Sequence, residues 1–237
     1  MHTGQDIRTD SGSSWFFDAG RIALDFAHTG GFADDPAGRR PRAHLGELLM
    51  TPADLDEWLS GHTEPIHVGA ADRELVDARA LRAAIARLAV AAAPAPAPAP
   101  APETTAADRN AAAAGLRAGT GRTQPARDDI DTVNLFAALP DVPPTLDGGR
   151  RRAGANRVRL AQALSSVARD AVALFTEVGF DDVAADGSPT RLSRCSAPDC
   201  GLVFYDSSRG GTRRWCAMQR CGNRAKVRAH RARQAAV

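Results

Sequence analysis

The clearest pattern along the chain is the helical spacing of its apolar residues. Between residues 72 and 92, apolar side chains recur every three or four positions, at Leu75, Ala78, Leu81, Ile85, Leu88 and Ala89. A second series of this kind runs from residue 156 to 178 and is followed by Gly179. This spacing predicts two long amphipathic helices, the second one ended by the glycine.

A third helix is predicted from its first residues. Thr51 is a good N-cap, Pro52 suits the first helical position, and Asp54 stands three residues after the cap. Gly61 stands where a helix commonly ends. Shorter helices are expected over residues 104–116 and 132–138.

Regular structure is harder to assign near the N-terminus. Residues 1–14 are polar and are predicted to be a disordered leader. Residues 15–17 and 21–29 are apolar-rich, and they form either a strand pair around the turn at 18–20 or, for residues 22–27, a helix. The alternating Ala-Pro tract at 93–102 predicts an inserted polyproline II loop, and residues 181–190 are read as a linker.

Composition agrees with a helical protein. The chain of 237 residues is 43% hydrophobic but only 5% aromatic, so alanine supplies much of the apolar content. Neither a long apolar run nor an apolar stretch at the start is found, so no membrane span or secretion signal is expected and the location is predicted to be cytoplasmic. Abundant alanine and arginine, with a single lysine, favour a bacterial origin.

Charge is distributed unevenly. From residue 191 onward the chain carries eleven basic and two acidic residues, a net +9, whereas residues 1–190 carry −7. All four cysteines lie in the basic segment, as two C-x₄-C pairs separated by fifteen residues: Cys195, Cys200, Cys216 and Cys221. Paired cysteines at this separation predict one tetrathiolate zinc site, and four protein ligands leave no open position, so the zinc is structural.

Disulfides and free thiols are the alternatives to zinc, and the expected reducing compartment disfavours the disulfides. Around the cysteines, residues 202–205 and 212–215 are predicted to be two strands of a hairpin. A terminal helix is predicted over 223–233, beginning beside Cys221. The fold class that follows is a mainly α N-terminal domain (15–180) with a small β element. A zinc-stapled β-hairpin plus helix (191–237), like a zinc ribbon or treble clef, completes it.

These residues resemble a known family. Residues 221–224 spell Cys-Gly-Asn-Arg, and the segment resembles the CGNR zinc finger, with further matches at 204–206, 208–209, 213–218 and 225–226. Residues 21–25, 52–58 and 81–82 resemble the ABATE-type domain that accompanies this finger. In that family an asparagine commonly stands where this chain has His28. The resemblance implies a stress-induced transcription regulator.

The basic residues indicate a partner for the finger. Arg224, Arg228 and Arg231 fall on one face of the predicted helix, and Lys226 and Arg233 share another. Nucleic-acid contacts, with double-stranded DNA favoured, are therefore predicted for Arg213, Arg214, Arg220, Arg224, Lys226, Arg228 and Arg231. The alternatives are a solvated charge run and a protein-interaction module that docks on an acidic partner, including the chain's own acidic domain.

Further expectations concern single residues, enzymatic activity and partners. Tyr205 and Trp215 are read as hairpin core residues, with stacking on unpaired bases as the alternative. Asp25 and His28 stand three residues apart and are candidates for a small ligand pocket or an acid–base pair. Since no nucleophile or catalytic motif accompanies them, no enzymatic activity is expected. A small-molecule effector and a homodimer are also considered.

Overall fold

The structure is a computed structural model that describes residues 2–8, 12–30, 46–94, 124–147, 150–153, 158–180, 190–198 and 200–235. Most of the Ala-Pro insertion, the helix expected over 104–116 and most of the linker 181–190 lie outside these residues. None of the described helices combines the length and the apolar character that crossing a membrane requires.

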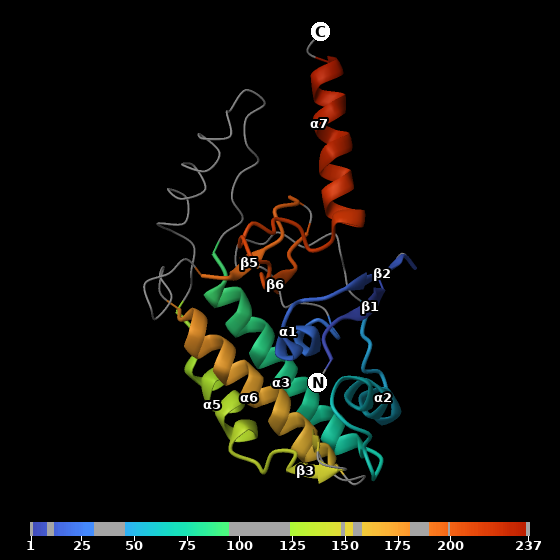
Figure 1. Cartoon of the computed structure of the whole chain (residues 1–237), viewed down its shortest axis with the longest axis vertical. Helices are drawn as coiled ribbons and strands as arrows, with labels where there is room; N and C mark the ends of the chain where they lie inside the picture. The colour runs from blue at the N-terminus through green and yellow to red at the C-terminus, as the bar shows by residue number, and fades with distance from the viewer. Residues whose placement is uncertain are drawn as a thin grey trace.

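Three helices that run side by side form the main layer: α3 (Asp72–Ala92), α5 (Arg127–Ala137) and α6 (Leu160–Val178) (Figure 1). The prediction over 72–92 is confirmed, and its apolar positions are buried. The helix expected from 156 begins at Leu160, because Val158 instead forms a parallel bridge with Ile66.

The short helices differ from their predictions in length. α2 (Pro52–His62) begins with the predicted capping box, but it continues past Gly61 to the cap residue Thr63. α5 begins at Arg127 rather than Thr132, since the buried carboxylate of Asp129 pairs with Arg87 of α3 at 3.0 Å and ties the first turn to the layer. A hairpin, β3 (Pro144–Asp147) with β4 (Arg150–Ala153), follows α5.

The prediction of a disordered leader is wrong for part of its length. β1 (Gln5–Arg8) pairs antiparallel with β2 (Ser14–Phe17), because Ile7 and Phe17 both bury their side chains in the core. The strand pairing of 15–17 with 21–29 is also wrong, and the helical alternative is confirmed as α1 (Ile22–Ala27).

The C-terminal segment contains β5 (Leu192–Arg194), β6 (Val203–Tyr205), a π-helical turn η1 (Met218–Gly222) and α7 (Asn223–Ala235). The hairpin is β5–β6, not the predicted pairing of 202–205 with 212–215. Residues 212–215 form no strand, since the N–H of Arg213 donates to the carboxylate of Asp206 at 2.8 Å instead of to a strand partner. The terminal helix is confirmed.

One hydrophobic core joins the two parts of the chain. Leu192, Val203 and Phe204 of the C-terminal hairpin are fully buried, in the same cluster as the inner side chains of α1, α3 and α6. The hairpin lies at the end of the helical layer near α1, whereas α7 extends away from it (Figure 1). The fold therefore holds the cysteine segment in place and leaves the last helix projecting.

Candidate metal centre and nucleic-acid interface

Two short turns bring the cysteine pairs together. In the first, the N–H of Cys195 donates to Leu202 at 2.9 Å and that of Cys200 donates to Ala197 at 3.0 Å. In the second, the N–H of Cys221 donates to Ala217 at 3.0 Å, in the wide turn η1 that precedes α7. Each pair thus sits on a backbone turn that fixes the direction of its thiols.

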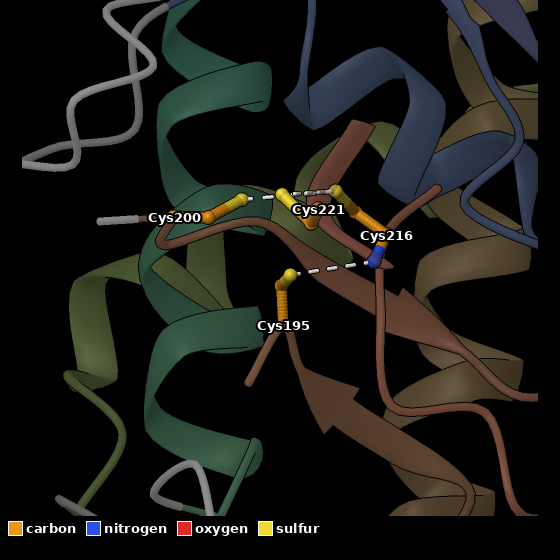
Figure 2. Close-up of side chains that lie close together, drawn as sticks. All are labelled: Cys195, Cys200, Cys216 and Cys221. Carbon is orange, nitrogen blue, oxygen red and sulfur yellow. Dashed lines mark hydrogen bonds between the residues drawn. The ribbon is translucent and has the colours of Figure 1, made fainter. Parts of the chain in front are cut away.

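The four cysteine Sγ atoms lie within 4.8 Å of one another, and all four residues are buried. Cys216 Sγ is 3.7 Å from Cys200 Sγ and 3.5 Å from Cys221 Sγ (Figure 2). Four sulfurs placed tetrahedrally at about 2.3 Å from a zinc ion are roughly 3.8 Å apart. The cluster fits one structural zinc ion, and the thiols form no disulfide.

Electrostatics within the cluster favour a bound cation. Contacts with Cys200 lower the pKa of the Cys195 thiol, whereas contacts with Cys195 raise the pKa values of Cys200 and Cys216. Thiols this close cannot all ionise by themselves, because each thiolate repels the next. A divalent cation removes that conflict and holds all four as thiolates.

Comparison with known families agrees with this geometry. Residues 191–234 match the CGNR zinc finger. Residues 20–178, more than half of the chain, match ABATE, a family described as "putative stress-induced transcription regulator". The chain belongs to the ABATE family. A search of curated proteins gave no match. The ABATE domain and the CGNR finger predicted from the sequence are thereby confirmed.

Within the CGNR motif, Cys221, Gly222 and Arg224 each have a structural role. The guanidinium of Arg224 donates to Cys221 Sγ at 3.2 Å, so it supports the ligand thiolate. Contacts with Cys195, and then this guanidinium, lower the pKa of Cys221. Gly222 is buried, and a Cβ there would lie 2.6 Å from Met218 Sδ and 3.3 Å from the Trp215 ring. The motif thus closes the second cysteine pair and starts α7.

Arg213 and Arg220, both predicted to contact nucleic acid, make contacts within the protein. The Arg213 guanidinium lies 4.3 Å from the Phe204 ring centroid and donates to the carbonyls of Cys216 at 2.6 Å and Asp18 at 2.9 Å. The Arg220 guanidinium lies 3.5 Å from the ring centroid of Trp15, in β2, shortly before the ABATE match begins at residue 20. Arg213 therefore links the finger backbone to Asp18, and Arg220 packs the finger against Trp15.

The finger meets the N-terminal part of the chain along a buried contact, which we call the seam. It consists of residues 15–28, which include the start of the ABATE match at residue 20, against residues 203–205 and 213–220 of the finger. The N–H of Tyr205 donates to Ala19 O at 2.8 Å, and the Tyr205 hydroxyl donates to Glu177 of α6 at 2.5 Å. A Cβ on Gly20, whose φ is +80°, would lie 2.5 Å from Tyr205 O. Tyr205 is therefore an interdomain contact.

Asp25 and His28 also lie at the seam. Both are 0% exposed, so neither lines a pocket open to solvent, contrary to the prediction. Asp25 accepts N–H donors from Gly4 at 2.8 Å and Ala19 at 3.0 Å, and His28 Nε2 donates to Val203 O at 2.8 Å. Burial raises the pKa of Asp25 to about 7 and lowers that of His28 to about 4.

The remaining predicted contact residues lie on the surface. Arg214 is exposed beside Trp215, with its guanidinium 5.4 Å from that ring's centroid. In α7, every residue from 226 to 234 is exposed, including Lys226, Arg228 and Arg231. The site therefore has two regions: a zinc-bound body engaged with the ABATE domain, and a projecting basic helix.

Sequence reasoning missed the seam residues Trp15 and Gly20. The one available signal was Gly20 itself, since a glycine two residues after an aspartate indicates a turn but not what approaches it.

Proposed function

We propose that this chain regulates transcription by binding duplex DNA through α7, with the zinc-bound finger as the base of that helix. The family match supports the regulator part, and the DNA contact is our addition. The observation that carries it is the exposure of residues 226–234, which contain four basic residues and no acidic one: Lys226, Arg228, Arg231 and Arg233.

Charge supports a polyanionic partner. Four thiolates and one Zn²⁺ contribute −2, which leaves residues 191–237 at about +7. Phosphate groups are the natural partners for exposed arginine and lysine at this density, and such contacts dominate affinity for nucleic acid. The basic residues of α7 cannot form ion pairs within their own helix, because α7 contains no acidic residue.

The set of proposed phosphate contacts is revised by the geometry. Arg213, Arg220 and Arg224 already engage carbonyls, a ring and a thiol, so we assign them to anchoring. The proposed phosphate contacts are Arg214, Lys226, Arg228, Arg231 and Arg233.

The test is fluorescence anisotropy of the zinc-loaded full chain on a mixed-sequence 30-bp duplex, titrated with salt. Four to five phosphate contacts predict a log–log salt slope of about −4. The double variant Arg228→Glu/Arg231→Glu is expected to lose binding while retaining zinc. Arg73→Glu, at a highly exposed arginine in α3, is the matched control and is expected to bind normally.

No binding by the wild type at low salt would overturn the proposal. It would instead favour the alternative, a basic helix that docks on an acidic protein. A small-molecule effector and a homodimer remain predictions for the ABATE domain.

We further propose that the chain is not an enzyme. What supports this is that Asp25 and His28 are both buried, that Asp25 accepts the N–H groups of Gly4 and Ala19, and that His28 Nε2 donates to Val203 O. Any turnover that depended on this pair would be lost in Asp25→Asn, and such a loss in a folded variant would overturn the proposal.

A further inference from the structure

The side chains of α7 are sorted into stripes around the helix. At about 100° per residue, Arg224, Arg228 and Arg231 share one side, and Lys226 and Arg233 lie about 180° away. A basic helix that docked on a flat acidic surface would need basic residues on one side only.

The two sides between the basic stripes differ in chemistry. One carries only alanine, at Ala225, Ala229 and Ala232. The other, which we call the polar stripe, carries side chains that are all exposed: Asn223, Val227, His230 and Gln234. Val227 is 49% exposed, although it is an apolar residue in an otherwise polar helix.

Opposite basic stripes match a groove with two anionic walls. The major groove of B-DNA is about 12 Å wide, and a helix with its side chains is about 10–12 Å across. With phosphate backbones on both sides, Arg228 and Arg231 on one side of the helix and Lys226 and Arg233 on the other find partners at once, while Arg224 of the first stripe stays on Cys221 Sγ. The exposure of α7 from residue 226 to 234 leaves the length needed for such insertion uncovered.

We propose that the polar stripe faces the floor of the major groove and reads base edges there; this inference rests on the proposed duplex binding. Asparagine and glutamine each offer a donor and an acceptor that match adenine, and an exposed apolar side chain suits the thymine methyl group. The alanine stripe offers no hydrogen bond, so it faces away from the bases. The partner is thus a duplex with specific A·T steps, not any polyanion.

The test is selection from duplexes of 30 bp with a randomised centre, using the zinc-loaded full chain. His230→Ala, Gln234→Ala and Val227→Ala are compared with Ala229→Ser and Ala232→Ser on the alanine stripe. Each polar-stripe variant is expected to lose about 5- to 100-fold discrimination at one or two base pairs. Affinity for a mixed-sequence duplex and the salt slope stay unchanged, because no phosphate contact is removed. The alanine-stripe variants should select the wild-type sequence.

Two results would overturn the inference and leave the proposed function intact. One is a wild-type chain that binds duplexes with the expected salt slope but selects no sequence. The other is a selected sequence that changes in the alanine-stripe variants and not in the polar-stripe variants. Absence of duplex binding would overturn both proposals together. Zinc content and helical circular dichroism of each variant establish that it is folded, and all five positions are exposed.

Discussion

Arginine is frequent both in the zinc-binding body of the finger and in α7, but the two regions use it in opposite ways. Arg213 and Arg220 lie against Phe204 and Trp15, and their guanidinium groups hold backbone and rings together. Arg228 and Arg231, only a few residues onward, are exposed on a helix that projects from the molecule (Figure 1).

The difference shows that clustering of arginine does not by itself define a binding surface. What separates the two groups is the seam: arginines that reach it contact protein carbonyls and aromatic rings, and those beyond it lie exposed on α7. A guanidinium is suited to both tasks, because it stacks on rings and also donates several hydrogen bonds. The following predictions separate the two roles.

Removing the zinc site is expected to have the largest effect. Cys200→Ser should release zinc and unfold the finger, since structural zinc contributes an apparent ~10–16 kcal/mol in small fingers. Zinc per chain, measured with a chelating dye, and tryptophan fluorescence check this. Ser207→Ala, at an exposed position of the same finger, is the control. A variant that retained one zinc per chain would contradict the four-thiolate site.

Arg213 and Arg231 should show opposite phenotypes. Arg213→Met leaves the carbonyls of Cys216 and Asp18 without their donor, so the free energy of unfolding should fall by about 2–4 kcal/mol. Arg231→Met should change it by less than about 0.5 kcal/mol, while the salt slope on duplex DNA falls by about 1. Urea denaturation and anisotropy provide the two measurements. Equal stability losses in both variants would contradict the distinction between an arginine that anchors the finger and one that contacts phosphate.

Features with a local signal were predictable from the sequence. The capping box at Thr51, the helical spacing over 72–92 and the paired cysteines each depend on residues a few positions apart. The direction of the Arg213 side chain depends on a distant residue, since its partner Asp18 is 195 positions away in sequence. A short stretch of sequence contains no information about which distant carbonyl an arginine will meet.

The strand partners were missed for a related reason. β6 and β2 were predicted, but β5 is only three residues long, too short for alternation to be visible, and β1 lies in a polar segment with Ile7 as its single strongly apolar residue. Their pairing is decided by burial against α1 and the helical layer. The seam therefore depends on tertiary contacts between distant segments, whereas the zinc site follows from the spacing of the four cysteines along the chain.

The close approach at the seam can be tested with two glycines of nearly equal φ. Gly20→Ala introduces a Cβ at 2.5 Å from Tyr205 O, whereas the same change at Gly12, with φ +81°, meets nothing within 4 Å. Both variants carry the strain of a positive φ, about 1–2 kcal/mol. Gly20→Ala should cost about 2–3 kcal/mol of unfolding free energy because the backbone must also move. Thermal unfolding measures the difference. Equal losses of stability in the two variants would mean that the backbone at the seam accommodates the added Cβ without destabilising the fold.

The smallest expected effects are the pH dependences of the two buried seam residues, which have opposite signs. The pKa of Asp25 is raised to about 7 from 3.8, so its contribution to stability is lost as pH rises through about 7. The pKa of His28 is lowered to about 4 from 6.5, so its contribution is present above 6.5 and lost as pH falls toward 4. Between pH 7.5 and 5.5 the two trends largely cancel in the wild type.

Single substitutions should expose each trend. In His28→Asn only Asp25 remains, and the free energy of unfolding should rise by about 2 kcal/mol between pH 7.5 and 5.5. In Asp25→Asn only His28 remains, and it should fall by about 1 kcal/mol over the same range. Urea denaturation at several pH values, with zinc content followed in parallel, measures both slopes. Opposite slopes would mean that both groups are buried at the seam in solution. Slopes of the same sign would contradict a closed seam, because a histidine in contact with water has no reason to resist protonation.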